Sequence, residues 1–402
     1  MNEVLVAILA YVLVTTMLAA LTRGNEVRVF GRKLVFTVAG FLVYLGGGKK
    51  AKRRKGVPKP LSLAMIGATL VGIALFYVQM LPMMVKTIAG FLASAAGAPG
   101  PSPQPSVVPL PLMLTYSSIV PYILLGLGIA IVVHEAMHAL IALKEGISVR
   151  SWGFGVIALI PFAFVEVDEE EFNSSPKSSR ASVLSAGPFA NAVVALLAFI
   201  AFIASSYALT SWAQPAVVIQ AVNCDICVGG CPAKEAGLQP GDIIALIDDS
   251  EIHSFSQIRK AVEKAGYGGE LEMVVCSPSG SCRRVDLVLN AWFRGTSRPC
   301  IGVELRQGYA VFENGRAYVP LSLNVLVQLA RASFFTFIIN YSLFVFNAIP
   351  LVITDGSKLL RILAEGMPRL EKLFSSRVFD IVNAVVIGIA MAISTYLILA
   401  GA

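Results

Sequence analysis

Charged residues are scarce in this sequence: Asp, Glu, Lys and Arg make up 14% of its 402 residues, whereas an ordinary soluble domain has about 25%. This scarcity excludes an ordinary soluble protein. The hydrophobic fraction of 56% and the mean hydropathy of +0.74 indicate a membrane protein with several spans. The formal net charge is +7, but many of the bases form one block between apolar runs. That arrangement is typical of a cytoplasmic anchor facing anionic membrane lipid, and it argues against a nucleic-acid partner. The block comprises Lys49, Lys50, Lys52, Arg53, Arg54, Lys55 and Lys59.

The first apolar run also lacks a basic segment ahead of it, which favours a membrane span with its N-terminus outside over a cleaved signal peptide. Six apolar runs are long enough to cross about 30 Å of hydrocarbon. They cover residues 4–22, 61–83, 117–143, 183–210, 324–348 and 380–400. The run 35–47 is too short to span, and we expect an interfacial hairpin there.

Lysine and arginine in the short loops set the expected orientation. They are dense in the loops 22–60 and 351–378, and absent from the proline-rich loop 97–113. We therefore expect the loops 22–60, 146–182 and 350–379 to be cytoplasmic and the segment 211–322 to lie outside a cell membrane. Acidic residues outnumber bases in the loop 146–182, but they contribute little to this rule.

No cysteine lies in an apolar run, and all six lie in the outside segment. An even number in an extracytoplasmic segment predicts disulfide bonds, and Cys276 and Cys282 would close the tip of a hairpin. The stretch CDICVGGC is also compatible with half of a zinc site, but no second pair of matching spacing follows it. The remaining connectivity is open.

Only three histidines occur in the chain, and two of them lie inside the third apolar run, in IVVHEAMHALIAL. His134 and His138 are four residues apart, so a helix presents both imidazoles on one face. Glu135 lies about 100° around the helix, beside that line. Two histidines with this spacing and an adjacent glutamate are typical of zinc hydrolases, in which the glutamate is the general base. The alternative is a pair of core histidines with local hydrogen bonds, although ionisable groups in a span are usually functional.

A catalytic zinc needs a third protein ligand and an open position for water. No third histidine is available in a predicted span, so we expect a carboxylate from the same side of the membrane. Asp355 follows the cytoplasmic end of the fifth apolar run, where Pro350 and Gly356 allow the chain to turn. The competing carboxylates are those of Glu145, Glu166 and Asp168.

Three motifs occur in or next to the predicted spans. The first is HExxH at 134–138. The second is Asn-x-x-Pro-x-x-x-x-Asp-Gly, formed by Asn347, Pro350, Asp355 and Gly356. The third is Gly-Pro-x-x-Asn, formed by Gly187, Pro188 and Asn191. Together they resemble the site-2 protease family of intramembrane zinc metalloproteases. The stretch 153–167 and the cysteine-bearing insertion are similar to the eukaryotic and archaeal branch. Thr354 departs from the leucine that the family commonly has there.

The resemblance implies one Zn²⁺ per chain, held by His134, His138 and Asp355, with Glu135 as the catalytic base. It also implies that Asn191 and Asn347 hydrogen-bond the substrate backbone; the alternative for both is a contact between helices. The expected function is cleavage of transmembrane segments, and the expected partners are transmembrane substrates, namely pre-cleaved single-span proteins.

The stretch GFGVIALIPFAFVEV, residues 153–167, is apolar and β-prone. We expect Gly153, Phe154, Gly155, Val156 and Ile157 to form a membrane-associated strand that pairs with the unwound substrate, since a spanning helix has to unwind before cleavage. The alternative is a cytoplasmic strand that packs only on the enzyme. Proline at Ile157 or Ala158 would test the pairing.

Within the outside segment, Ala236–Ile243 reads AGLQPGDI, which resembles a stretch of bacterial-type PDZ domains. A turn, an apolar strand, an acidic turn and a short helix are expected here, followed by strands at ELEMVV and RRVDLVL. The peptide-carboxylate loop of such domains is not apparent in the sequence, and Ile301, Gly302 and Val303 are a candidate for their glycine-containing strand. The alternative is a rigid plug that excludes large substrates and binds no peptide.

The expected fold class is a membrane α protein: a six-helix bundle with an inserted extracytoplasmic PDZ-like β/α domain and a membrane-associated β segment. The expected domains are 1–60, 61–210, 211–322 and 323–402. One rival function is a non-proteolytic membrane adaptor that docks peptides. Another is a protease that trims lipidated C-termini, but such enzymes use a glutamate as third ligand and have no PDZ insertion.

Overall fold

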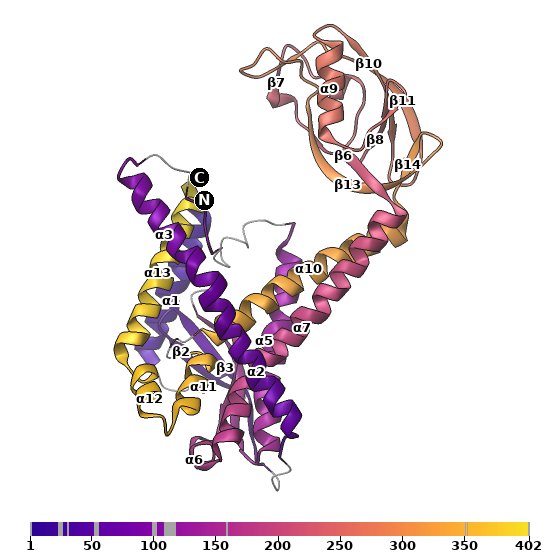
Figure 1. Cartoon of the computed structure of the whole chain (residues 1–402). Coiled ribbons are helices and arrows are strands. Elements are labelled where there is room, and N and C mark those ends of the chain that lie inside the picture. The colour runs from indigo at the N-terminus through magenta and orange to yellow at the C-terminus, as the bar shows by residue number, and fades with distance from the viewer. Residues whose placement is uncertain are drawn as a thin grey trace. The chain divides into compact units, whose positions relative to one another are not determined.

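The computed structural model describes residues 2–22, 27–29, 32–51, 56–98, 103–107, 118–157, 160–349, 351 and 353–400. Pro350, Ala158 and residues 52–55 of the basic block lie outside these ranges, as does much of the proline-rich loop. The chain divides into two compact units, Met1–Phe199 with Phe334–Ala402, and Ile200–Ser333 (Figure 1). The metal ligands predicted from the sequence all belong to the first unit.

Within these described ranges, five helices are long and apolar enough to cross a membrane. They are Lys59–Ala95, which comprises α2 (Lys59–Leu75), the π-helical turn η1 (Phe76–Met80) and α3 (Leu81–Ala95), and then α5 (Val120–Lys144), α7 (Lys177–Trp212), α10 (Leu321–Ala348) and α13 (Arg377–Ala400). The first predicted span, residues 4–22, lies within α1 (Asn2–Thr22), which is not among these five helices. The count of six therefore stays a prediction.

Three helices, α2, α7 and α10, pack against α5. Gly126 in α5 lies against α10, where an added Cβ would be 3.1 Å from the Cα atom of Thr336. On the other side, Ile141 of α5 packs with Met65 of α2 and Val183 of α7 in a buried apolar cluster. The absence of a side chain at Gly126 and the small residues on α7 let these backbones approach, as is common between membrane helices.

An antiparallel five-stranded sheet completes the first unit, in the order β1-β2-β3-β4-β5. Its strands are β1 (Val27–Val29), β2 (Arg32–Thr37), β3 (Gly40–Lys49), β4 (Val149–Ile157) and β5 (Ile160–Val167). The short apolar run 35–47 thus forms most of the β2–β3 hairpin, turning at Ala39, which has a positive φ of 61°. β5 lies against α5.

The stretch 153–167 is a β hairpin, but its first strand cannot have the role expected from the sequence. Gly153–Ile157 belong to β4, which pairs with β3 on one side and with β5 on the other. Both backbone edges of β4 are therefore occupied, and a substrate strand has no free edge to join. In the described part of the chain β5 pairs only with β4, so β5 is an edge strand, as β1 is at the other side of the sheet.

The second unit is mainly antiparallel sheet. Its strands are β6 (Gln214–Val222), β7 (Cys227–Val228), β8 (Ile243–Ile247), β9 (Ser250–Glu251), β10 (Glu270–Cys276), β11 (Cys282–Val288), β12 (Trp292–Phe293), β13 (Val303–Glu313) and β14 (Arg316–Tyr318). The main path is β11-β10-β8-β6-β13-β14, and β7 pairs separately with β12. The helix α9 (Phe255–Ala265) buries Ile258 and Val262 in the core of this unit.

The local predictions for the second unit agree with these elements. β8, an acidic turn at Asp248 and Asp249 with positive φ, and α9 follow one another as expected, and β10 pairs with β11. The cysteines lie in three pairs, Cys224–Cys231, Cys227–Cys300 and Cys276–Cys282. The PDZ-like character of this unit stays a prediction.

Candidate metal centre

His134, His138 and Asp355 converge in the first unit. The Nε2 atoms of His134 and His138 are 3.1 Å apart, and each is 3.2 Å from Oδ2 of Asp355. The His134 side chain is 8% exposed, and those of His138 and Asp355 are 12% and 14% exposed. These three residues are a group of potential metal ligands within the described ranges.

The three distances fit a zinc ion. Zinc is bound at about 2.0–2.1 Å by histidine nitrogen and carboxylate oxygen, and tetrahedral geometry then separates two ligand atoms by roughly 3.3 Å. Nδ1 of His138 donates to the carbonyl oxygen of Val183 at 2.7 Å. In the neutral imidazole this leaves Nε2 unprotonated, facing a carboxylate oxygen with no proton between them. A cation in the centre of the triangle satisfies these atoms.

Three helices build the site. α5 places its two histidines one turn apart, and α7 passes beside them at Gly187, where a Cβ atom would be 2.4 Å from Nε2 of His138 and 2.5 Å from Nε2 of His134. The missing side chain of Gly187 is therefore what leaves room for the two imidazoles. Asp355 is the first residue of α11 (Asp355–Ala364).

The start of α11 is fixed by its neighbours. Thr354 is the N-cap: its hydroxyl accepts from the backbone N–H of Ser357 and donates to the carbonyl oxygen of Leu351 at 2.9 Å. Gly356 lies so close to α10 that a Cβ atom would be 2.2 Å from the carbonyl oxygen of Ala348. The departure from the family at Thr354 thus supplies a helix cap, which the sequence reasoning did not anticipate.

Ion pairs fix the rest of α11. Arg180 of α7 forms a two-point pair with Glu365, at 2.8 and 2.7 Å. This hydrogen bond with Arg180 holds the pKa of the Glu365 carboxyl below its usual range. Arg361 pairs in the same two-point way with Asp380 of α13, at 3.0 and 2.8 Å. The third ligand therefore lies on a helix anchored to two spans.

Glu135 lines a cavity of about 520 Å³ between α5 and the sheet. Most of the wall is apolar and includes Trp152, Phe154 and Phe164, with Val165 of β5 also among the lining residues. Glu135 is half-buried. A carboxylate is therefore available at the wall of an apolar space next to the three candidate ligands.

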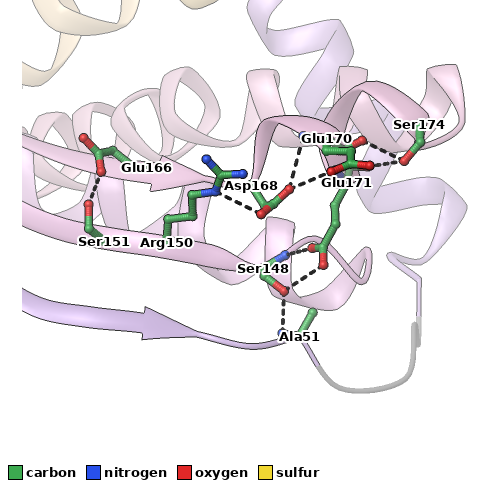
Figure 2. Close-up of polar contacts among 9 residues, drawn as sticks. All are labelled: Ala51, Ser148, Arg150, Ser151, Glu166, Asp168, Glu170, Glu171 and Ser174. Atoms are coloured by element: carbon green, nitrogen blue, oxygen red, sulfur yellow. Dashed lines mark hydrogen bonds and ion pairs between the residues drawn. The ribbon is translucent and has the colours of Figure 1, made fainter.

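The competing carboxylates are engaged elsewhere. Glu145 is buried and accepts from Ser179 and from the backbone N–H of Val57, both at 2.7 Å. Figure 2 shows that Glu166 accepts from Ser151 and that Asp168 caps α6 (Glu169–Ser174).

Asp168 also pairs with Arg150 at 2.9 Å. The backbone N–H of Glu171 and the Arg150 guanidinium hold the pKa of Asp168 below its usual range. Each competitor thus has a local structural role.

The two asparagines of the motifs differ in their surroundings. Asn191 in α7 is fully buried, and its Nδ2 atom is 3.3 Å from Nδ1 of His134. Asn347 is half-buried in the last turn of α10. The structure thus places Asn191 in a contact between two helices, which is the alternative that the sequence left open, and its partner there is the candidate ligand His134.

The His134 and His138 imidazoles and the Asp355 carboxylate converge from packed helices, and the Glu135 carboxylate lies on the cavity wall beside them. This arrangement defines a site of the metallopeptidase kind. Residues 122–393 match peptidase family M50. Because this match covers more than half of the chain, the chain belongs to that family, which includes the site-2 proteases. With its five spanning-length helices, it is an integral membrane protein.

Three relatives illustrate the similarity. A putative zinc metalloprotease of Clostridium perfringens is 28% identical over 177 residues, which cover 38% of this chain and 50% of the relative. The regulator of sigma-E protease RseP of Escherichia coli is 28% identical over 209 residues, 44% of each chain. A membrane-bound transcription factor site-2 protease homolog of Arabidopsis thaliana is 27% identical over 138 residues, 34% of this chain and 26% of the relative. The chain spans half or less of the length of these relatives.

Proposed function

We propose that this protein is a zinc-dependent intramembrane endopeptidase that cleaves transmembrane segments of membrane proteins. The observation that carries the proposal is the triangle of His134, His138 and Asp355 with sides of 3.1–3.2 Å. Membership of peptidase family M50 supports a peptidase, and the name of the Clostridium relative supports zinc.

His134, His138 and Asp355 hold the zinc ion, one per chain. A bound zinc ion would act as a Lewis acid, which polarises a peptide carbonyl and lowers the pKa of a bound water molecule. Glu135 accepts the proton of the attacking water and delivers it to the leaving amine. The apolar cavity beside Glu135 accommodates the substrate backbone and limits the access of bulk water.

The substrate enters as an extended segment, since a helix offers no free backbone groups. We assign strand pairing to β5 instead of the interior strand β4, because β5 is an edge strand, packs on α5 and lines the cavity with Ala163, Phe164 and Val165. Asn347 binds the substrate backbone. Pre-cleaved single-span proteins are the proposed substrates.

The protein resides in a cell membrane with the active site in the cytoplasmic half, as the distribution of bases in the loops predicts. The segment 211–322 lies outside, as a PDZ-like domain that its three disulfides stabilise. The segments 1–60, 61–210 and 323–402 form the membrane part.

Glu135→Gln tests the proposal. The purified variant should bind one zinc per chain like the wild type, but its cleavage of a membrane-span reporter should fall by about 10²–10⁴-fold. Glu169→Gln, which changes an exposed carboxylate in α6, is the matched control and should cleave normally. Equal cleavage by the wild type and Glu135→Gln would refute the mechanism. Zinc-free wild-type protein that cleaves nothing and only docks peptides would favour the adaptor function.

The role of β5 has a separate test in the Glu135→Gln background. A photo-crosslinking residue at Ala163 should trap a substrate segment, whereas the same residue at Val35 in the interior strand β2 should not. Equal trapping at both positions would contradict pairing at β5. Proline at Ile157 no longer tests substrate pairing, since Ile157 pairs with Ile160 within the hairpin.

A further inference from the structure

Asn191 has a buried oxygen atom without a partner. Its side chain is fully buried, its Nδ2 atom is 3.3 Å from Nδ1 of His134, and its Oδ1 atom has no hydrogen-bond partner within the described part of the chain. A buried acceptor left unsatisfied costs about 1–3 kcal/mol. The two ends of an asparagine amide exchange places when the group rotates by half a turn, and they are assigned from the hydrogen-bond network.

The chemistry of His134 decides between the two rotations. If His134 binds an ion through Nε2, the imidazole proton is on Nδ1, which then donates a hydrogen bond. Nδ1–H facing the NH₂ group of Asn191 would place donor against donor. The other rotation gives Nδ1–H an acceptor and gives the buried Oδ1 its missing donor.

In His138, Nδ1 also faces an oxygen atom of α7, and here the direction of the hydrogen bond is certain. Its Nδ1 is 2.7 Å from the carbonyl oxygen of Val183, which can only accept. Val183, Gly187 and Asn191 are spaced by four residues, so they follow one face of α7. One face of α7 thus offers an oxygen to His138, space for both imidazoles, and an oxygen to His134.

We propose that Asn191 is a positioning residue for the metal site. Its Oδ1 accepts from Nδ1–H of His134 and holds the imidazole in the tautomer whose Nε2 atom faces His138 and Asp355. This proposal rests on the proposed zinc function and replaces the substrate-binding role expected from the sequence. The full burial of Asn191 supports the positioning role over substrate binding, because a substrate would have to displace packed side chains to reach Asn191.

Zinc affinity of purified full-length protein, measured by competition with a chelator, tests the proposal. Asn191→Leu keeps the number and branching of the side-chain non-hydrogen atoms but removes the acceptor, and should weaken zinc binding by about 10–100-fold. Asn191→Asp keeps an oxygen acceptor and should restore most of the affinity. The matched control is Asn340→Leu. Asn340 is equally buried, its Nδ2 atom donates to the carbonyl oxygen of Thr336, and its Oδ1 atom is also unpaired in the described residues. Asn340 hydrogen-bonds no histidine within those residues, so Asn340→Leu should leave zinc affinity unchanged.

The absorption spectrum of the cobalt-substituted protein gives a second readout, which should change in Asn191→Leu and resemble the wild type in Asn191→Asp. If Asn191→Leu does not fold, Asn191→Ala carries the same expectation.

Wild-type zinc affinity in Asn191→Leu with slower cleavage would overturn the proposal and restore the substrate role. Equal loss of zinc affinity in Asn191→Leu and Asn191→Asp would also overturn it, in favour of packing alone. Failure of the wild type itself to bind zinc would instead overturn the proposed function.

Discussion

Replacing Gly187 with alanine should strongly weaken zinc binding while leaving α7, the helix that contains Gly187, intact. The added Cβ would lie 2.4 Å from Nε2 of His138 and 2.5 Å from Nε2 of His134. Non-bonded heavy atoms pack at roughly 3.5–4.0 Å, so each imidazole has to withdraw by about 1 Å. That is half the length of a zinc–nitrogen bond of about 2.0–2.1 Å.

The expected loss can be bounded from this displacement. Removing an outer hydrogen-bond partner of a ligand already weakens metal binding by about 10–100-fold. Moving two ligands off the ion should therefore cost at least about 100-fold, or roughly 2.7 kcal/mol. Alanine is also a better helix former than glycine by up to about 1 kcal/mol, so α7 itself should form normally.

The assay is chelator competition for zinc on the purified protein, with circular dichroism to follow helix content. Gly128→Ala is the matched control: Gly128 lies on the same helix as the histidines, and an added Cβ there meets no atom of the described residues within 4 Å. It should leave zinc affinity unchanged. Wild-type zinc affinity in Gly187→Ala would refute the claim that Gly187 makes room for the ligands.

Three further changes concern α11. Gly356→Ala should displace the start of this helix and weaken zinc binding, because its Cβ would be 2.2 Å from the carbonyl oxygen of Ala348; unchanged zinc affinity would contradict this. Thr354→Ala should lower the free energy of unfolding by about 1 kcal/mol through loss of the N-cap, whereas Thr354→Ser should not, and a denaturant titration that finds both variants equal to the wild type would rule out the cap. Glu365→Gln should destabilise the protein at neutral pH. The pKa of Glu365 is held low by Arg180, so its contribution is present above the ordinary pKa of 4.5 and is lost as the pH falls through the folded-state pKa. The stability gap between Glu365→Gln and the wild type should therefore shrink in acid, and a gap independent of pH would contradict the ion pair.

The sequence allowed the ligands themselves to be predicted because each depends on local spacing. His134 and His138 share a helix face by periodicity alone, and Asp355 was identified through its spacing from Asn347 and through the resemblance to the site-2 proteases. The structure brings these three residues together, as that reasoning expected. The pair Cys276–Cys282 was likewise predictable from the short hairpin that it closes.

What could not be predicted depends on contacts between distant segments. Residues 153–157 were predicted to pair with a substrate because the sequence does not reveal their actual partner β3, which comes from residues 40–49, about a hundred positions earlier. The space at Gly187 exists only because α7 crosses α5 at that residue. The anchoring of Glu365 by Arg180 joins groups 185 residues apart. The spacing of residues within a short stretch of sequence does not predict which distant segment that stretch will contact.

The ligand triangle also joins remote parts of the chain, since His138 and Asp355 are 217 residues apart. An ion held only by the folded arrangement contributes RT ln(1 + [L]/Kd) to its stability, about 2.7 kcal/mol when the ion is present at 100 times its dissociation constant. By mass action, the catalytic ion would then also act as a crosslink between α5 and α11. The persistence of this fold in the membrane would rise and fall with the supply of metal in the surrounding cell.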